Sequence, residues 1–250
     1  MESLKISKKI CLVCPVLNCW KYTKQFVENL DFSQFNKLII INNGSDSENT
    51  FNLWQLAKNK QIDVIHHPNN IGVAPAWNEG TKRAIETYKS EYIIICNNDI
   101  IVRPDTIKNL IKGIKKPGIA LITPTNTKDF DEEPKKLYEF LIPKKLKLTD
   151  NPDFSCFMIT KKTIEKVGYF DENFWPAYFE DNDYHYRIKL AGLRGVKSNK
   201  SLYFHFGSMT IKSGGAIAVI SNENYLKNQA YFVKKWGGLP GQKTSSIPLI

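Results

Sequence analysis

The sequence predicts a single α/β domain built around a mostly parallel β-sheet. Continuous apolar runs, typical of strands buried on both faces, alternate with segments whose apolar residues recur at helical spacing. The connections between them are short, which favours parallel strands joined by right-handed crossovers. With 250 residues, 42% of them apolar and 24% charged, the chain has the length and composition to bury one large core.

Strand and helix alternate through the first half of the chain. Apolar runs without polar alternation predict strands at residues 9–17, 37–41, 62–66, 92–96 and 118–124. Helical spacing of apolar residues predicts helices at residues 21–30, 50–60, 73–89 and 106–115. Pro15 cannot donate to a central ladder and therefore ends the first strand, while Pro75 fits only the first turn of its helix.

The second half is less regular. Residues 126–150 are rich in Pro, Lys, Asp and Glu, and we expect a long irregular segment there with a short hairpin at 137–142. An aromatic loop is expected at 170–178, and the tail at 237–250 is expected to be loose. The remaining elements are predicted as strands at residues 154–160 and 196–206 and helices at residues 161–167, 179–190 and 222–236.

Polar turns follow the first four strands. They contain Asn18, Asn42-Asn43-Gly44, Asn69-Asn70 and Asn97-Asn98-Asp99. Because ligands in open α/β sheets bind outside the carboxyl ends of the strands, these turns are expected to converge on one ligand-binding edge. A carboxylate with neighbouring amide oxygens suits Mg²⁺ or Mn²⁺ and, through the cation, a phosphate. Each turn taken alone is equally well explained as a polar loop.

Composition limits the remaining choices. The net charge of +10 comes from dispersed lysines, and no nucleic-acid-binding motif is present, so at most weak contact with an anionic membrane surface is expected. The sequence has no apolar window of membrane-spanning length and no hydrophobic signal core, so we expect a soluble, cytoplasmic protein. Cys11 and Cys14 have C-x-x-C spacing but lie in a strand-like run, which favours small core residues over a redox or metal site.

Seven short motifs follow one another between residues 14 and 238. They are C-P-V-L-N, N-N-G-S, N-x-G-x-A-x-A-W-N-E-G, C-N-N-D, F-D-E-N-F with Y-F-E-D-N-D-Y-H-Y-R, a strand histidine, and K-W-G-G. In this order they resemble the family 2 nucleotide-sugar glycosyltransferases of the GT-A fold, especially the rhamnosyltransferase-like branch. The resemblance implies one GT-A domain over residues 1–250, with a nucleotide-sugar half at 9–124 and an acceptor half at 125–236.

The resemblance also implies a site for a nucleoside diphosphate-sugar. The residues it places against this donor are Pro15, Val16, Asn18, Asn42, Asn43, Asn70, Gly72, Asn78, Asn97 and Asn98. Asp99 and His205 correspond to metal-binding positions for Mn²⁺ or Mg²⁺. Asn97 replaces an aspartate that is usual in the family, which weakens the implied metal requirement.

The chemistry implied by the resemblance lies at Glu180-Asp181. Family 2 enzymes invert the anomeric centre, and Asp181 matches the base that deprotonates the acceptor hydroxyl. Trp175, Tyr178 and Glu180 are expected to contact a glycan acceptor, while the metal, aided by a cation from the Lys212 segment, would stabilise the leaving diphosphate. The simpler reading of Glu180-Asp181 is acidic charge at a helix N-terminus.

Two other functions remain open at this level. A sugar-phosphate nucleotidyltransferase would need a Gly-rich loop bearing Arg or Lys after the first strand, and C-P-V-L-N has neither feature. A nucleotide-sugar-binding module without transfer activity is compatible with the single carboxylate in Asn97-Asn98-Asp99. The resemblance favours transfer of a sugar, with rhamnose on UDP or dTDP as the first expectation.

Overall fold

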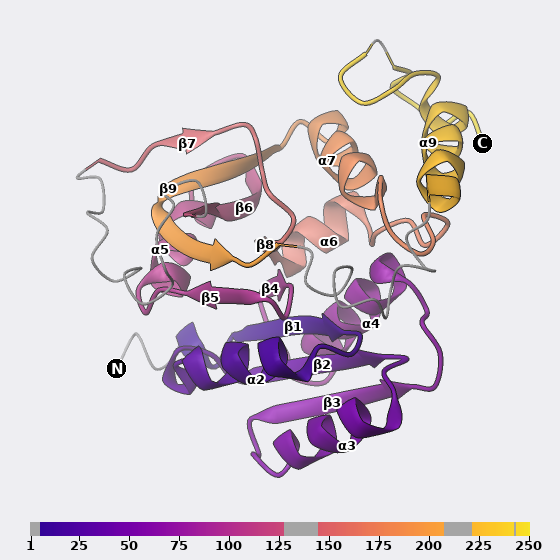
Figure 1. Cartoon of the computed structure of the whole chain (residues 1–250). Coiled ribbons are helices and arrows are strands. Elements are labelled where there is room, and N and C mark those ends of the chain that lie inside the picture. The colour runs from indigo at the N-terminus through magenta and orange to yellow at the C-terminus, as the bar shows by residue number, and fades with distance from the viewer. Residues whose placement is uncertain (1–5, 128–144, 208–221, 243) are drawn as a thin grey trace.

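The computed structural model describes residues 6–127, 145–207, 222–242 and 244–250. Within these residues the strands form one curled, nine-stranded sheet in the order β3-β2-β1-β4-β8-β6-β9-β5, with β7 paired to β9 (Figure 1). The strands are β1 Ile10–Val16, β2 Lys37–Asn43, β3 Ile62–His67, β4 Tyr92–Cys96, β5 Ile100–Val102, β6 Ile119–Asn126, β7 Leu148–Thr149, β8 Cys156–Thr160 and β9 Arg194–His205. The helices are α2 Trp20–Asn29, α3 Ser47–Leu56, α4 Val73–Glu86, α5 Thr106–Ile114, α6 Lys161–Val167, α7 Glu180–Leu190 and α9 Asn222–Trp236, with a 3₁₀ turn at Phe32–Gln34.

The predicted α/β fold is confirmed, and its first four strands pair in parallel as expected, in the order β3-β2-β1-β4. The rest of the sheet is mixed. Strand β8 lies between β4 and β6 and is antiparallel to both, and β9 is parallel to β6 but antiparallel to β5. As a result, the amino end of β8 reaches the same edge as the carboxyl ends of β1 and β4.

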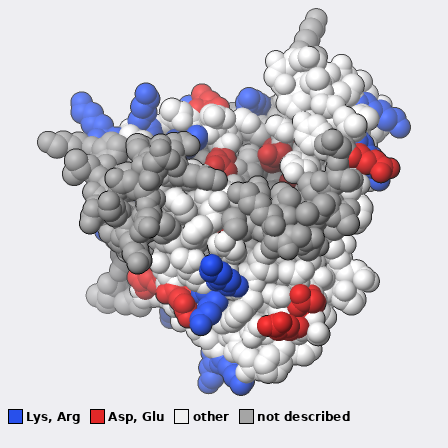
Figure 2. Space-filling model, viewed as in Figure 1, with Lys and Arg blue, Asp and Glu red and all other residues white. Residues whose placement is uncertain are grey.

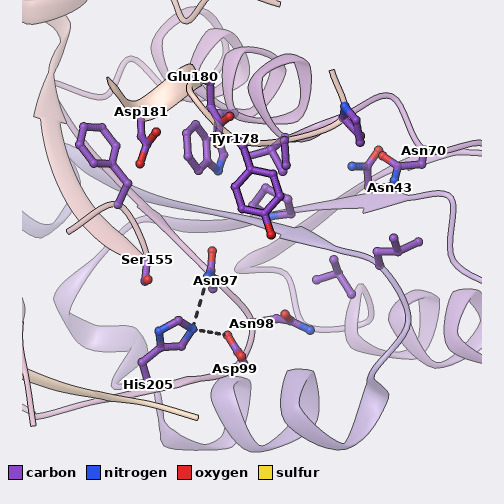
Figure 3. A pocket seen from close by; sticks show the side chains of 18 of the residues that line it. Asn43, Asn70, Asn97, Asn98, Asp99, Ser155, Tyr178, Glu180, Asp181 and His205 are labelled. Carbon is purple, nitrogen blue, oxygen red and sulfur yellow. Dashed lines mark hydrogen bonds and ion pairs between the residues drawn. The ribbon is translucent and has the colours of Figure 1, made fainter. Parts of the chain in front are cut away.

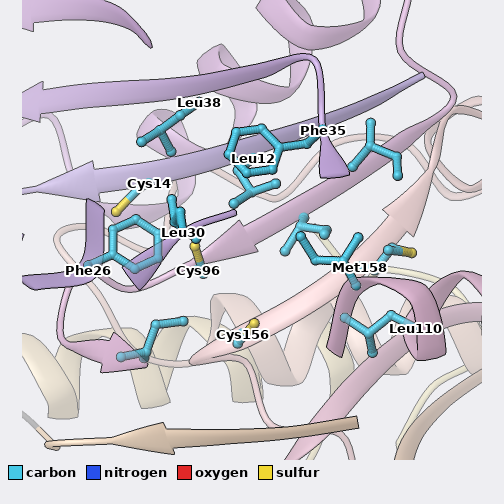
Figure 4. Packing of buried hydrophobic residues seen from close by; sticks show 14 of the residues in the cluster. Leu12, Cys14, Phe26, Leu30, Phe35, Leu38, Cys96, Leu110, Cys156 and Met158 are labelled. Carbon is cyan, nitrogen blue, oxygen red and sulfur yellow. The ribbon is translucent and has the colours of Figure 1, made fainter. Parts of the chain in front are cut away.

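The core lies on both faces of the sheet, as the unbroken apolar runs predict. On one face α2 and α5 pack over alternate residues of β1 and over β4 and β8 (Figure 4). On the other face α4, α6 and α7 pack over the intervening residues. Because side chains alternate between faces, Cys11 and Cys14 belong to opposite clusters, and both thiols are buried. They pack as small core residues.

Four regions differ from the sequence prediction or lie outside the described residues. Strand β5 was not predicted, because its three residues follow the polar Asn97–Asp99 turn too closely to show periodicity. The expected hairpin at 137–142 and the Lys212 segment lie outside the described residues. The tail was expected to be loose, yet Ser245 and Leu249 donate backbone hydrogen bonds to the carbonyls of Trp236 and Lys235. Over the described ranges, every helix is too short or too polar to span a bilayer.

Candidate active site

A cavity of about 400 Å³ opens at the sheet edge where β1 and β4 end and β8 begins. Figure 3 shows that its labelled side chains come from segments far apart in the sequence. The structure brings eleven of the sixteen predicted site residues to its wall: Pro15, Val16, Asn43, Asn70, Asn97, Asn98, Asp99, Tyr178, Glu180, Asp181 and His205. The polar strand ends therefore converge as the sequence predicts.

One wall is made by Asp99 and His205. The antiparallel register of β5 and β9 places Ile100 opposite His205, and the Phe206 N–H donates to the Asp99 carbonyl at 3.0 Å. This register brings His205 Nε2 within 3.0 Å of Asp99 Oδ1, although the two residues are 106 positions apart. Asp99 is 4% exposed, so its carboxylate faces the cavity rather than bulk water.

The Asp99–His205 pair suits a divalent cation whose remaining ligands include phosphate oxygens. Asp99 Oδ1 and His205 Nε2 are hydrogen-bonded at 3.0 Å, so a carboxylate oxygen and an imidazole nitrogen face the same point of the wall. A carboxylate oxygen with an imidazole nitrogen suits Mn²⁺ better than Mg²⁺. The described residues contain no cluster of three His, Cys, Asp or Glu side chains, so these two would need ligands from substrate and water.

Asn97 and Asn98 continue this wall in different ways. The Asn97 amide nitrogen lies 3.5 Å from His205 Nε2, and its backbone N–H donates to the Ser155 carbonyl at 2.9 Å. Asn98 is 4% exposed and donates from Nδ2 to Thr23 Oγ1 at 2.8 Å. Asn98 thereby ties the β4–β5 connection to α2, while Asn97 keeps polar atoms toward the cavity.

Glu180 and Asp181 lie across the cavity from Asp99 and His205 (Figure 3). They begin α7 directly after Tyr178 and Phe179, whose φ angles of 79° and 72° put two consecutive non-glycine residues in the left-handed region. Such residues cost of order 1–3 kcal/mol each and persist only where the surroundings enforce them. Asn228 of α9 enforces this turn, because its Nδ2 donates to the carbonyls of Ala177 (2.8 Å) and Tyr178 (3.2 Å).

The two carboxyl groups sit in an environment that disfavours negative charge. Burial, and then the neighbouring Asp181, raise the pKa of Glu180 to about 8. Burial also raises the pKa of Asp181, although the backbone N–H groups of Asn182 and Asp181 oppose the shift. A raised pKa makes Asp181 a stronger proton acceptor than an exposed carboxylate.

A buried ionic cluster clamps α9 onto the loop before α7. Lys235 Nζ lies 2.7 Å from Asp171 Oδ2 and 2.6 Å from Asp183 Oδ1. Asp183 is fully buried and also accepts from Arg187 Nε at 2.8 Å and Trp236 Nε1 at 2.9 Å. The Asp183–Arg187 pair is therefore structural, and the cluster supports the turn that presents Glu180 and Asp181.

Five predicted site residues do not line the cavity. Asn42 is fully buried: its Nδ2 is hydrogen-bonded to Thr50 Oγ1 and His66 Nδ1, and its Oδ1 accepts from the Ser45 N–H. Asn18 is likewise engaged, accepting from the Asp46 N–H at 2.9 Å. Both side chains therefore connect neighbouring segments of the chain. Consecutive strand residues point to opposite sides of the sheet, so Asn43 and not Asn42 faces the cavity.

The others among these five support the aromatic loop. Asn78 is 1% exposed, accepts from the Phe170 N–H at 2.9 Å and donates to Phe170 O and Glu172 Oε1. Gly72 has φ 96°, and a Cβ there would lie 2.8 Å from Trp175 Cδ1. Gly72 therefore admits the Trp175 indole, which is 41% exposed outside the cavity wall.

Sequence reasoning missed Asp153 and Ser155, which line the cavity at the amino end of β8. Asp153 accepts from Tyr203 Oη at 2.6 Å and from the Ser155 N–H at 2.9 Å. Strand β8 was predicted, but its antiparallel direction was not, and only that direction carries its first residues to this edge. The sequence holds no local signal for it.

The face shown in Figure 2 has acidic and basic side chains interspersed, without one large patch of either sign among the coloured residues. The described residues that line the cavity include no Lys or Arg. Acidic groups and amides therefore predominate among the polar side chains of the described wall.

Several known proteins are similar to this chain in sequence. A family model described as Glycosyl transferase family 2 matches residues 11–174. The chain is 26% identical over 218 residues to a Leishmania donovani "Galactofuranosyl glycosyltransferase", covering 70% of this chain and 49% of that protein. It is 24% identical over 172 residues to the Haloferax volcanii "Low-salt glycan biosynthesis hexosyltransferase Agl10", covering 63% and 54%. The chain thus spans about half the length of these curated relatives.

Two solved structures share the GT-A fold. A crystal structure of GalNAc-T7 with UDP, GalNAc and Mn²⁺ aligns with TM-score 0.67 and 13% identity, over 91% of this chain and 48% of that one. A structure of S. aureus TarS 1-349 aligns with TM-score 0.56 and 15% identity, over 90% and 73%. At these identities the likeness concerns the fold.

Proposed function

The chain belongs to glycosyl transferase family 2, and from that premise we propose that it transfers a sugar from a nucleoside diphosphate-sugar to a hydroxyl group of a glycan acceptor. The observation that supports this most directly is the division of the cavity. The Asp99–His205 pair, which we assign to a cation, faces a pair of carboxyl groups, Glu180 with Asp181 (Figure 3). Displacement at an anomeric carbon is favoured by a base on the acceptor side and by positive charge at the leaving group, on opposite sides of the sugar.

In the proposed reaction Asp181 accepts the proton of the acceptor hydroxyl. The hydroxyl oxygen attacks the anomeric carbon, the bond to the diphosphate breaks, and the configuration inverts. A cation held by Asp99 and His205 would supply positive charge for the leaving diphosphate. Asn97, beside His205, and Asn70, farther along the wall, offer amide groups to the donor, while Asn43 holds the Ile71–Gly72 backbone and Tyr178 and Glu180 border the acceptor.

The absence of Lys and Arg from the described part of the cavity wall supports a role for the cation. The polar groups that a diphosphate would meet there are otherwise mainly carboxylates and amides.

The identity of the donor sugar is supported only by similarity. The resemblance of the sequence favours rhamnose on UDP or dTDP, and one relative carries the name of a galactofuranosyl transferase. Both sugars therefore belong in a donor screen.

The cation role predicts a specific effect of Asp99→Asn. The amide keeps the shape but loses the charge that holds a divalent ion, so the half-saturating Mn²⁺ concentration is expected to rise by roughly tenfold or more. Titrating Mn²⁺ into the EDTA-treated protein at fixed UDP and following intrinsic fluorescence measures it. Asp105→Asn is the matched control, because Asp105 pairs with Arg103 away from the cavity. An unchanged Mn²⁺ requirement in Asp99→Asn would remove Asp99 from the metal site.

The proposal is tested by thermal unfolding with a panel of UDP- and dTDP-sugars, with and without Mn²⁺. A ligand that binds only the folded state stabilises it by RT ln(1 + [L]/Kd) and therefore raises the midpoint. At least one nucleotide-sugar is expected to raise it, with a larger shift when Mn²⁺ is present. If no member of the panel raises it, the proposed function fails.

A further inference from the structure

Glu180 is a buried residue of the cavity wall, and one oxygen of its carboxyl group has no hydrogen-bond partner among the described residues. The residue is 6% exposed and lines the wall beside Asp181. Its Oε2 atom is inaccessible to solvent and has no hydrogen-bond partner among the described residues. A buried oxygen without a donor costs about 1–3 kcal/mol, and more when it carries charge, so these surroundings favour the neutral acid over the carboxylate.

The surroundings of Glu180 offer it no positive charge. The ionisable groups of the cavity wall are Asp99, Asp153, Tyr178, Asp181 and His205. Of these, His205 is hydrogen-bonded to Asp99 on the far wall. Behind the wall, Lys235 pairs with Asp171 and Asp183, and Arg187 also pairs with Asp183. The N-terminus of α7 favours a carboxylate, but burial outweighs it and the pKa of Glu180 is raised to about 8.

We propose that Glu180 works as a neutral carboxylic acid that donates a hydrogen bond, from the side of its carboxyl group that lines the cavity, to a hydroxyl oxygen of the bound sugar acceptor. Its neighbour Asp181 stays ionised and takes the proton of the attacking hydroxyl. The two adjacent carboxyl groups thus hold one proton between them before the reaction, on Glu180. After transfer each holds one, and Asp181 returns its proton to solvent.

The proton on Glu180 also keeps Asp181 usable as a base. If both groups were ionised, two adjacent negative charges would occupy a buried wall that lacks a described cation. The identity of the acceptor as a sugar rests on the proposed function. The protonation state of Glu180 does not, and it can be tested without any substrate.

The substrate-free test compares wild type with Glu180→Gln, which mimics the neutral acid. Between pH 4.5 and about 8 the folded wild type holds a proton that the unfolded chain has released, so its stability falls as pH rises. The glutamine variant lacks this loss. Its unfolding midpoint minus that of wild type is therefore expected to increase with pH over this range and to level off above it. Glu165→Gln, at an exposed site, is the control and should show no such trend.

A constant midpoint difference between wild type and Glu180→Gln across this range would overturn the proposal, whatever the activity of the protein.

A second test measures kcat/KM with a donor and an acceptor that the enzyme turns over. Wild type should lose activity above pH 8 more steeply than Glu180→Gln. Glu180→Met, of similar length but unable to donate, should fall about tenfold below Glu180→Gln at pH 7. Equal kcat/KM for these two variants would show that no hydrogen bond is donated.

Discussion

Replacing Asp181 with Asn is expected to lower kcat by roughly 10²–10⁴-fold, the usual contribution of a positioned general base. The amide preserves the shape of the side chain but cannot accept the proton of the acceptor hydroxyl. Because Asp181 lies across the cavity from Asp99 and His205, binding of the nucleotide-sugar should change little (Figure 3). Steady-state rates at saturating donor, together with the donor Kd from calorimetry, separate the two effects.

Asp150→Asn is the matched control for this substitution. Asp150 is an exposed aspartate that pairs with Arg194 outside the cavity wall, so its replacement should leave kcat unchanged. A second check comes from pH. Burial raises the pKa of Asp181, so the acid side of the wild-type rate profile should lie above the ordinary range of an aspartate. A wild-type rate in Asp181→Asn would show that the base lies elsewhere.

Replacing Lys235 with Met is expected to lower the free energy of unfolding by about 3 kcal/mol. Removing one partner of a buried ion pair typically costs 3–5 kcal/mol, because the other charge stays buried without compensation. Here Asp183 keeps Arg187 and Trp236, and Asp171 keeps Tyr231, so the lower end applies. Urea unfolding measures the change as a lower midpoint at an unchanged slope.

Lys234→Met provides the control, since Lys234 is the exposed neighbour on the same helix. It removes the same charge and adds the same side chain, so it should change stability by less than about 0.5 kcal/mol. If both variants unfold at the same urea concentration, the Lys235 cluster does not hold α9 to the loop before α7.

Most of the donor side of the fold follows from the sequence, because its signals are local. The runs 37–41 and 92–96 are apolar without a break, which predicts buried parallel strands and places Asn43 and Asn97 at one sheet edge. The sequence does not show whether Asn42 or Asn43 faces the cavity. This depends on the residue at which β2 leaves the ladder, and a shift of one position reverses which side chain faces the cavity.

The opposite wall and the pairing of Asp99 with His205 depend on long-range register. Nothing near residue 99 reveals that β5 will pair with β9, yet that pairing brings Asp99 to His205. Similarly, Asp153 and Ser155 reach the cavity only because β8 runs antiparallel to β4, with Cys96 opposite Cys156. The left-handed turn at Tyr178 and Phe179 contains no glycine, so the sequence does not predict it. Contacts from Asn228 of α9 hold this turn in place.

The central claim is that this cavity transfers sugar from a nucleotide donor with Asp181 as the base. The most direct measurement is the release of nucleoside diphosphate from UDP- and dTDP-sugars with Mn²⁺, by wild type and Asp181→Asn side by side. Wild type is expected to release UDP or dTDP from at least one donor. Asp181→Asn is expected to bind that donor equally well but to release the nucleoside diphosphate at least about 100-fold more slowly. Binding without release by the wild type, or equal release by both proteins, would contradict the account.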